Sequence, residues 1–403
     1  MRILVVSNLY PPAVRGGYEM ECAGVVDHLR RSHEVHVLTS TNGSGGEDVL
    51  RALPLLEENA SGALRAPFAA MRAARVARRE AAVFRPELVF VWNGSQIPHA
   101  ALRVLDGLGA PVAFRIMEHW FTRMYGDGDQ FMRHLEPGER GLRGAWASGV
   151  RTLNRLDPAL RLDPHRRVRA AVCWVSRALA ESSPAPPVVD VAHEEVLFPS
   201  TPNVERFAQV VRSPDAEPLL LYASRVERQK GPDVVIRALA RLAGELPTAR
   251  LVLAGGEDEA FGRELRALAA ELGVAARVEF LGRVEPGALA ELAARAHVWL
   301  MPSVWEEPAP NGCVEAALAR VPLVASRVGG IPEVTVDGVH GLLFTPGDDE
   351  DCARAVSETL RDPLGTARRV EAAAGRAQGM RRAPYLARMD RFLEQAVEAL
   401  AGR

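Results

Sequence analysis

The sequence almost lacks lysine. Of its 49 lysine and arginine residues only one, Lys230, is a lysine, so arginine supplies nearly all of the positive charge. An ammonium group on a flexible stem is a compact, strongly hydrated charge that suits a phosphate-binding loop. The alternative is that Lys230 is an ordinary solvated lysine that remains by chance. The motifs in the rest of the chain distinguish these two interpretations.

Sulfur and long apolar runs are also scarce. The four cysteines, Cys22, Cys173, Cys313 and Cys352, stand far apart, with no CxxC pair and no histidine spacing that suits zinc. We therefore expect free thiols in a reducing compartment. No apolar stretch reaches the roughly 18 residues of a membrane span, and the first apolar run is too short for a signal-peptide core. These absences predict a cytoplasmic protein, either free or peripheral to the inner face of the membrane.

The charge balance gives no sign of nucleic-acid binding. The formal net charge is −2 and the pI is about 6.6. Basic residues nevertheless gather in the N-terminal half, at Arg72, Arg75, Arg78, Arg79 and Arg85 and again at Arg161, Arg166, Arg167 and Arg169. Such arginines usually form a solvated face, and the alternative is a surface that meets anionic lipid or an anionic acceptor.

The chain is long enough for two domains, because a single core rarely grows beyond about 250–300 residues and this chain has 403. Short runs rich in Val, Leu and Ile alternate with helical stretches, which is typical of parallel α/β units. The predicted strands are 3–7, 34–39, 88–92, 111–116 and 171–176 in the first half, and 219–223, 251–254, 278–281, 298–301 and 322–326 in the second. The proline-rich passage 184–202 is interpreted as the connection between the domains.

The predicted fold class is therefore α/β, with two Rossmann-like, doubly wound parallel sheets facing a central cleft. Ligands of such sheets bind at the carboxyl ends of the strands. We expect one domain at 1–200, a second at 201–383, and a C-terminal helix at 384–403 that packs back across a lobe, in our prediction the N-terminal one. Apolar residues at helical spacing from Leu386 to Leu400 predict that helix.

Three turns that contain glycine follow predicted strands. The first ends in Gly16-Gly17 and opens a helix, where backbone amides can approach an anion. The second is Arg225-x4-Lys230-Gly231, and the third contains Gly329-Gly330. Each is a weak signal alone, since glycines in such turns are usually structural, but three together favour an anion-binding site.

A pair of glutamates marks a further segment. Glu307 and Glu315 are separated by seven residues in a stretch that follows a predicted strand and opens a helix. One carboxylate can hold hydroxyl groups of a ligand while the other reaches a second part of it. A general acid with a nucleophile, as in glycosidases, and plain surface charge are the alternatives. The neighbouring Trp305 and the apolar continuation argue against surface charge.

Taken together, these motifs resemble those of the family 4 glycosyltransferases (GT4), which have the two-lobed GT-B fold. The motifs that carry the resemblance are Gly16-Gly17, Arg225-x4-Lys230-Gly231, Gly255-Gly256, Phe280-Leu281-Gly282, Pro302-Ser303 with Glu307-x7-Glu315-Ala316, and Gly329-Gly330-Ile331-Pro332-Glu333 with Gly341-Leu342-Leu343. The resemblance implies a retaining, metal-independent hexosyltransferase that takes a UDP- or GDP-sugar and needs no cofactor. Its N-terminal domain would bind the acceptor and its C-terminal domain the nucleotide-sugar. The implied acceptor is a sugar, a lipid-linked sugar or a small natural product, in cell-surface glycan, glycolipid or natural-product biosynthesis.

The same resemblance implies roles for single residues. Arg225 and Lys230 would hold the donor pyrophosphate, Glu307 the sugar hydroxyls and Glu315 the ribose. His119 ends a strand near the reacting carbon, so the implied catalytic residues are His119, Arg225, Lys230 and Glu307. The other residues implied to contact the donor are Gly16, Gly17, Gly255, Arg283, Val284, Ala309, Asn311 and Gly312.

The chain departs from the family in the loop before Glu315. Pro310 stands where relatives often carry glycine, and Pro308 lies in the same loop. Prolines donate no N–H, so hydrogen bonds to the sugar must come from the neighbouring amides. The stretch Asp127-Gly128-Asp129 resembles a metal-binding DxD motif, but it lies in the N-terminal half and is interpreted as chance.

Two rival hypotheses remain. A GT-B-like sugar-nucleotide epimerase or hydrolase would use the same donor site without an acceptor. A non-catalytic or NAD-binding two-domain protein is disfavoured, because no GxGxxG followed by an acidic residue occurs.

Overall fold

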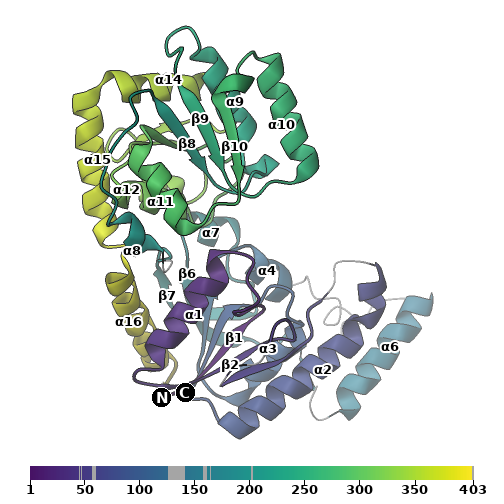
Figure 1. Ribbon diagram of the computed structural model, residues 1–403. Helices are drawn as coiled ribbons and strands as arrows, with labels where there is room; N and C mark the ends of the chain where they lie inside the picture. The colour runs from purple at the N-terminus through teal and green to yellow at the C-terminus, as the bar shows by residue number, and fades with distance from the viewer. Residues whose placement is uncertain are drawn as a thin grey trace. The chain divides into compact units, whose positions relative to one another are not determined.

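The computed structural model describes residues 1–44, 46, 48–56, 60–125, 141–157, 161–163, 165–200 and 203–401. The chain forms two compact units, each built on one sheet (Figure 1). The first unit comprises Met1–Leu197 and Leu386–Arg403, and the second comprises Phe198–Tyr385. The chain therefore passes from one unit to the other twice.

The first unit contains a seven-stranded sheet in the order β3-β2-β1-β4-β5-β6-β7, with every pair parallel. Its strands are β1 (Arg2–Ser7), β2 (Glu34–Ser40), β3 (Val49–Leu53), β4 (Leu88–Asn93), β5 (Val112–Ile116), β6 (Val168–Trp174) and β7 (Val189–Val196). Its helices are α1 (Gly17–Leu29), α2 (Ala60–Phe84), α3 (His99–Leu105), the 3-10 turn η1 (Asp106–Leu108), α4 (Trp120–Tyr125), α6 (Gly141–Leu156) and α7 (Arg177–Ser182).

The two edge strands of this sheet were not predicted. β7 lies inside the proline-rich passage that the sequence assigned to a domain connection, and β3 pairs with the far side of β2. The connection is thus shorter than predicted, because part of the passage completes the first sheet.

The last helix, α16 (Arg382–Ala401), crosses the boundary between the units in sequence. From Leu386 onward it belongs to the first unit, where Met389, Phe392 and Leu393 are buried. Arg388 pairs with Glu195 of β7 at 2.6 Å. The C-terminal helix therefore completes the core of the N-terminal unit.

The second unit contains a six-stranded parallel sheet in the order β10-β9-β8-β11-β12-β13. Its strands are β8 (Leu219–Ala223), β9 (Arg250–Ala254), β10 (Val278–Gly282), β11 (Val298–Met301), β12 (Leu323–Ser326) and β13 (Leu342–Phe344). Its helices are α8 (Val204–Phe207), η2 (Arg228–Lys230), α9 (Pro232–Arg241), α10 (Glu259–Glu271), η3 (Ala275–Arg277), α11 (Pro286–Arg295), α12 (Asn311–Leu318), α13 (Ile331–Val334), α14 (Asp349–Arg361) and α15 (Pro363–Gln378).

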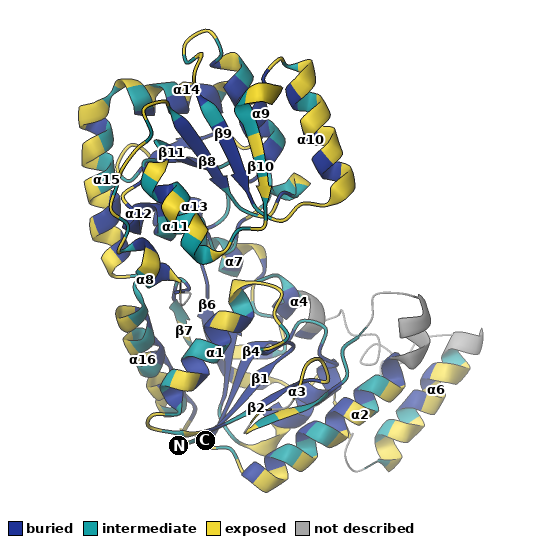
Figure 2. Ribbon diagram, viewed as in Figure 1, coloured by how far each residue is buried: buried dark blue, intermediate teal, exposed yellow. Residues whose placement is uncertain are grey.

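Both faces of the second sheet are buried at β8, β9 and β11, which are dark in Figure 2, whereas the edge strand β10 is partly exposed. Side chains alternate along β8, so Leu220 and Tyr222 join the apolar cluster with α9, α10 and α14. Leu219 and Leu221 join the opposite cluster with α11, α12 and α15. Strands buried on both faces read as continuous apolar runs, which is why the sequence predicted this strand with its correct bounds.

No helix within the described ranges is both long enough and apolar enough to span a membrane.

Candidate functional site

Two adjacent strands of the second unit carry the central residues of the predicted site. β8 and β11 pair in parallel, with Leu220 opposite Val298 and Tyr222 opposite Leu300. Parallel strands end at the same edge of a sheet, so the loops that follow them lie next to each other. Side chains 77 positions apart in the sequence meet there.

The loop after β8 presents Arg225 to solvent. The Tyr222 hydroxyl donates to the Arg225 carbonyl oxygen at 2.6 Å and fixes the start of the loop. Gly255 packs beneath it, because a Cβ at this position would lie 1.8 Å from the Ser224 carbonyl oxygen. The Arg225 side chain is 62% exposed and reaches the Glu227 carboxylate at 2.5 Å. Its guanidinium is thus accessible to an anion at the end of the strand.

Gly231 allows the two loops to approach each other. Its φ is +63°, and a Cβ there would lie 2.1 Å from the Pro302 carbonyl oxygen. The Val304 amide donates to the Gln229 carbonyl oxygen at 3.0 Å, which ties the loops together. A residue with a side chain at position 231 would be strained both by the left-handed backbone and by the contact.

Lys230 and Glu307 form an ion pair between these loops. Lys230 Nζ lies 2.5 Å from Glu307 Oε1, and the two side chains are 12% and 7% exposed. The Ser303 hydroxyl donates to the same carboxylate oxygen at 2.5 Å. The Lys230 ammonium also lies 5.3 Å from the centre of the Trp305 ring, within cation–π range. Both charges are mostly withdrawn from water and held in place, so a ligand meets a preformed pair of opposite charges.

The main chain of Glu307 is supported by the glycine turn after β12. The Gly330 amide donates to the Glu307 carbonyl oxygen at 2.7 Å. A Cβ on Gly329, whose φ is +55°, would lie 2.5 Å from the Glu307 amide nitrogen. The third glycine turn of the sequence therefore serves to position Glu307. The part played by Ser303 was not predicted, although the residue stands inside a motif that was noted.

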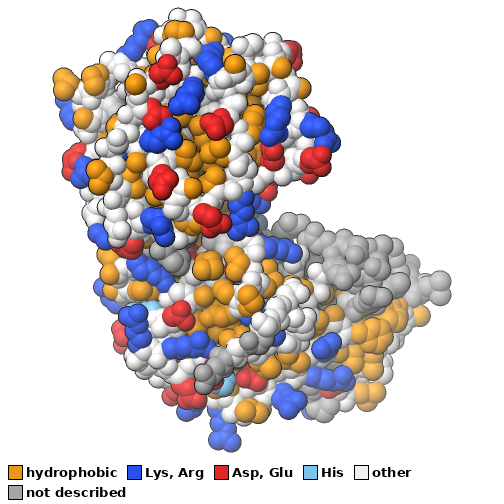
Figure 3. Space-filling model, viewed as in Figure 1, with side chains coloured by type: hydrophobic (Ala, Val, Ile, Leu, Met, Phe, Trp, Pro, Cys, Tyr) orange, Lys and Arg blue, Asp and Glu red, His pale blue; other side chains and the backbone are white. Residues whose placement is uncertain are grey.

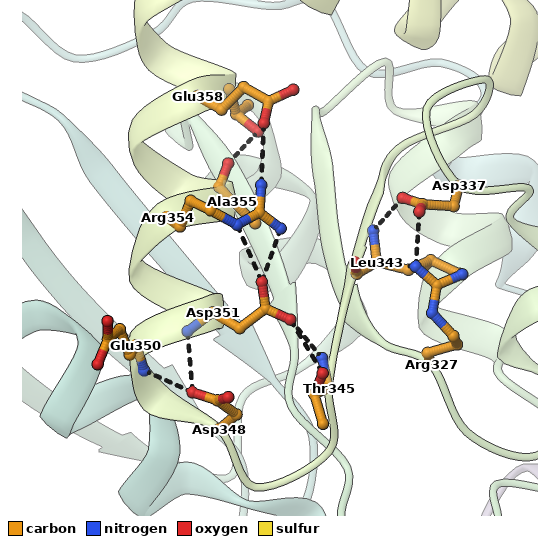
Figure 4. A network of polar contacts seen from close by, with 11 residues as sticks. Arg327, Asp337, Leu343, Thr345, Asp348, Glu350, Asp351, Arg354, Ala355 and Glu358 are labelled. Carbon is orange, nitrogen blue, oxygen red and sulfur yellow. Dashed lines mark hydrogen bonds and ion pairs between the residues drawn. The ribbon is translucent and has the colours of Figure 1, made fainter.

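A polar network attaches this turn to rigid elements (Figure 4). Arg327, which opens the turn, pairs with Asp337 at 2.6 Å, and Asp337 also accepts from the Leu343 amide of β13 at 2.8 Å. Next to it, Asp351 of α14 accepts from the Thr345 amide at 2.8 Å. The support of Glu307 thus extends to β13 and α14.

The second glutamate, Glu315, lies in the second turn of α12. Desolvation of its carboxyl group raises the pKa of Glu315 to about 7. Within the described part of the chain, no amide or side chain donates to this carboxylate. Glu315 is half-buried, so hydroxyl groups of a ligand can reach its poorly solvated carboxylate and donate to it.

The start of α12 offers few backbone donors. Pro310 precedes the helix and has no N–H, and the Asn311 amide already donates to the Ala309 carbonyl oxygen at 2.9 Å. Among the described residues, the amides of Ala309 and Gly312 make no hydrogen bond. Of the three amides considered from the sequence, these two are left to donate to a ligand.

The residues expected beside the nucleotide base follow β10. Gly282 has a φ of +65°, and its carbonyl oxygen accepts from the Gly255 amide at 2.8 Å. The ends of β9 and β10 are therefore tied together at the same edge of the sheet. Arg283 is exposed, and Val284 packs against the core below it.

The remaining predicted residues, Gly16, Gly17 and His119, lie in the first unit. Gly16 precedes α1, and its amide donates to the Glu19 carboxylate at 3.0 Å, while Gly17 is the first residue of the helix. His119 follows β5 and is half-buried next to Trp120. All three are at carboxyl ends of strands, but Glu19 already occupies the amide of Gly16.

No metal site is seen in the part of the chain that the structure describes. No group of three or more His, Cys, Asp or Glu side chains there is placed to hold an ion. Asp127 and Asp129, the pair that resembles a metal-binding motif, lie outside the described residues.

Comparison with known families identifies the second unit. Residues 203–376 match the family model described as "Glycosyl transferases group 1". The chain carries a group 1 glycosyltransferase domain. This match includes the residues from Arg225 to Glu315 that the sequence predicted to contact a donor, and it confirms the resemblance to the GT4 glycosyltransferases.

The curated relatives match less than half of this chain. A D-inositol 3-phosphate glycosyltransferase of Mycobacterium avium is 34% identical over 194 residues, which is 47% of this chain and 45% of the relative. The protein of that name from Stackebrandtia nassauensis is 38% identical over 169 residues, 40% of this chain and 37% of the relative. The matched part is thus less than half the length of these relatives.

Solved structures show the fold of the whole chain. A glycosyltransferase from Rickettsia africae has a TM-score of 0.71 at 16% identity, covering 100% of this chain and 99% of that one. Sucrose-phosphate synthase from Thermosynechococcus elongatus has a TM-score of 0.69 at 18% identity, with 99% of each chain covered. Anabaena HepE, solved in complex with UDP and glucose, has a TM-score of 0.64 at 19% identity and covers 98% of this chain and 100% of its own. The predicted GT-B fold, with two parallel-sheet α/β domains, is confirmed.

Proposed function

We propose that the protein is a retaining glycosyltransferase that moves a hexose-type sugar from a UDP- or GDP-sugar to an acceptor hydroxyl. The observation that carries this proposal is the Lys230–Glu307 ion pair, which lies with Glu315 at the strand ends of the group 1 domain. The names of the curated relatives and the UDP and glucose bound to HepE support it.

Binding of the donor would break the Lys230–Glu307 ion pair and give each of the two side chains a new partner. A pyrophosphate brings negative charge to the edge of the sheet, and it would draw the Lys230 ammonium away from Glu307 and the exposed Arg225 away from Glu227. The Glu307 carboxylate is then free to accept hydrogen bonds from sugar hydroxyls. This exchange keeps each buried charge paired, which avoids the cost of an isolated one.

The ribose, the sugar and the base of the donor would contact residues of α12, of the loop before it and of the loop after β10. Glu315 accepts from the ribose hydroxyls, the Ala309 and Gly312 amides donate to the sugar side of the donor, and Arg283 with Val284 flanks the base. Charge that develops on the leaving phosphate is stabilised by Lys230 and Arg225, and such preorganised charge is often the largest contribution to catalysis.

The proton of the acceptor goes to the leaving phosphate on the same face of the sugar, because the described donor loops hold no side chain placed as a nucleophile. His119, at the carboxyl end of β5, is assigned to the reacting carbon by the family resemblance. Since the two cations already neutralise the pyrophosphate, we propose that the reaction needs no divalent metal ion.

A nucleotide-sugar panel tests the donor. A ligand present at 100 times its Kd stabilises the fold by about 2.7 kcal/mol, so the true donor should raise the melting temperature of the full chain. Arg225→Gln, which removes an exposed cation, should weaken that rise without changing the melting temperature of the free protein by much. Lys230→Met should abolish the rise but also destabilise the free protein, because it leaves the buried Glu307 carboxylate without its cation. If no UDP-, GDP- or ADP-sugar raises it, the proposal fails.

Nucleotide release then tests the transfer. D-inositol 3-phosphate is the first acceptor to try, because the curated relatives bear its name; a sugar, a lipid-linked sugar and small natural products follow. Release of UDP or GDP only in the presence of an acceptor supports a transferase, whereas release without one points to a hydrolase and a changed sugar without release points to an epimerase.

We also propose that the first unit contacts an anionic membrane through α2 and α6. These helices meet where the rings of Phe68 and Trp146 lie 6.5 Å apart. Their exposed apolar residues include Phe68, Val83, Trp146, Leu153 and Leu156. Figure 3 shows apolar side chains over this part of the surface. The neighbouring arginines would meet lipid phosphates, so binding to anionic vesicles should weaken as salt rises; equal binding to neutral vesicles would contradict this.

A further inference from the structure

A small cavity in the first unit is lined by four arginines. Its volume is about 100 Å³, and Arg78, Arg103, Arg161 and Arg166 contribute to its wall. Arg78 comes from α2, Arg103 from α3, and the other two from the segment that leads into β6. α3 with η1 runs down to the start of β5, so all these parts lie at the amino edge of the sheet, away from the carboxyl ends where Gly16 and His119 stand.

The charges around the cavity are unequal. The only carboxylate in its described wall is that of Asp163, which accepts from the His165 amide at 2.8 Å. Behind the wall, the side chain of Asp106 is 1% exposed and pairs with Arg103 at 3.2 Å and also with Arg166. Among the described residues, four guanidinium groups and the carboxylates of Asp163 and Asp106 thus lie in or directly behind the wall of the cavity.

Arg103 supplies a donor that the protein does not use. Its side chain is 2% exposed, and its terminal nitrogens donate to Asp106 and to the Asp163 carbonyl oxygen. Its Nε–H is buried and has no acceptor among the described residues. Buried donors in native proteins are nearly always satisfied, so an unmade hydrogen bond in the wall of a cavity indicates a missing partner.

The cavity is also held open by its backbone. Arg161 has a φ of +42°, a conformation that is unfavourable for an arginine and is concentrated at functional sites. The Asn154 side chain holds this turn by bonding both the amide and the carbonyl of Leu162 at 3.0 Å. Gly107 leaves room for Arg166, since a Cβ there would lie 2.7 Å from its Nη1.

We infer that this cavity binds a phosphate-type oxyanion, as a site separate from the donor site. A space of about 100 Å³ is roughly three times the volume of a water molecule and far below the roughly 300 Å³ of a drug-sized ligand site. It admits a tetrahedral phosphate or a phosphomonoester group and excludes a whole nucleotide-sugar. The phosphate can come from solution or from the headgroup of a membrane lipid.

The experiment compares two pairs of substitutions in the full chain. The cavity variant is Arg78→Gln with Arg161→Gly, where glycine suits the left-handed backbone, so folding is preserved. The control is Arg31→Gln with Arg391→Gln, which removes two exposed arginines of the first unit that neither line the cavity nor lie on α2 or α6. Hydrogen exchange of residues 99–108 and 165–174 is measured against inorganic phosphate at constant ionic strength.

Phosphate should protect these segments in the wild type and in the control, with half-saturation shifted at least about ten-fold in the cavity variant. Protection of residues 225–231 would report the donor site separately, so this result does not depend on the proposed activity. No more protection with phosphate than with chloride in the wild type, or equal half-saturation in the two variants, overturns the inference.

Vesicles distinguish the two sources of the phosphate. If phosphatidic acid in phosphatidylcholine vesicles binds the control better than the cavity variant, and free phosphate competes, the headgroup is the ligand. If the two variants bind these vesicles equally while their phosphate protection differs, the ligand is a soluble oxyanion.

Discussion

Replacing Glu315 by glutamine should make the protein more stable at alkaline pH and poorer at binding nucleotide. The carboxyl group lies in α12 with a pKa raised to about 7 by desolvation, and no described residue donates to it. Because the folded state holds the proton more tightly than the unfolded state, stability is lost as pH rises through this pKa. Glutamine carries no charge and escapes that loss.

The size of the effect follows from the two pKa values. A shift from 4.5 in the unfolded chain to about 7 corresponds to roughly 3.4 kcal/mol at full ionisation. At pH 5 only about 0.8 kcal/mol of this is lost, and at pH 8 nearly all of it. The stability of Glu315→Gln relative to wild type should therefore rise by about 2.5 kcal/mol between pH 5 and pH 8.

The assay is urea unfolding of both proteins without nucleotide at pH 5, 6, 7 and 8. Hydrogen exchange in peptides of β11 and α12 assigns the transition to the second unit, since two units need not unfold together. Glu271→Gln, which removes an exposed carboxylate of α10, is the matched control and should show no comparable gain. Nucleotide affinity is measured in parallel and should fall in Glu315→Gln alone.

A stability difference between the two proteins that does not change with pH would refute this prediction, because the expected gain comes from ionisation of Glu315 and not from its packing. A gain in stability without any loss of nucleotide affinity would agree with the raised pKa of Glu315 but would show that this residue does not bind the donor.

Four further outcomes are expected. Lys230→Arg should fold normally yet lose at least about ten-fold in kcat/KM, because the site beside Trp305, where the lysine side chain is only 12% exposed, suits a compact ammonium better than a planar guanidinium. Wild-type kinetics of this variant would contradict the prediction. Glu307→Gln should lower kcat by roughly ten- to two-hundred-fold, the equivalent of about 1.5–3 kcal/mol for a charged hydrogen bond, and an unchanged kcat removes it from the site. EDTA should leave turnover unaffected, and loss of activity restored by Mg²⁺ or Mn²⁺ would be the opposite result. Gly231→Ala should lower the melting temperature by at least about 4 °C, because the new Cβ meets the Pro302 carbonyl oxygen, and an unchanged melting temperature would show that the loops can separate.

The central strands and the edge strand β10 could be predicted, whereas the other three edge strands, β3, β7 and β13, could not. β8 and β11 are buried on both faces, so their sequences are unbroken apolar runs and their bounds were correct. β7 lies at the edge of its sheet and carries Asp190, Glu194 and Glu195, with prolines on either side. Such a strand resembles a polar loop in the sequence, because half of its surface meets water.

In the candidate site, too, the sequence predicted single residues but not the contacts that the folded sheet creates between them. The spacing of the motifs predicted Lys230 and Glu307 as site residues. Their ion pair forms because β11 lies next to β8, and the order of strands in a sheet cannot be predicted from the local sequence. The Ser303 hydroxyl and the support by Gly329 depend on the same assembly. The arginine cavity of the first unit was seen only as excess charge at Arg78, Arg161 and Arg166.

The course of α16 has a consequence for biosynthesis. The N-terminal unit needs Met389, Phe392 and Leu393 in its core, and these residues are made only after the whole of Phe198–Tyr385. Those 188 residues take on the order of 10–40 s at translation rates of about 5–20 residues per second. During that time the nascent N-terminal unit exposes an apolar groove where the helix belongs. A stop codon that removed only the last helix would leave this apolar surface uncovered in the finished protein, so the truncated chain should aggregate more readily than the full one.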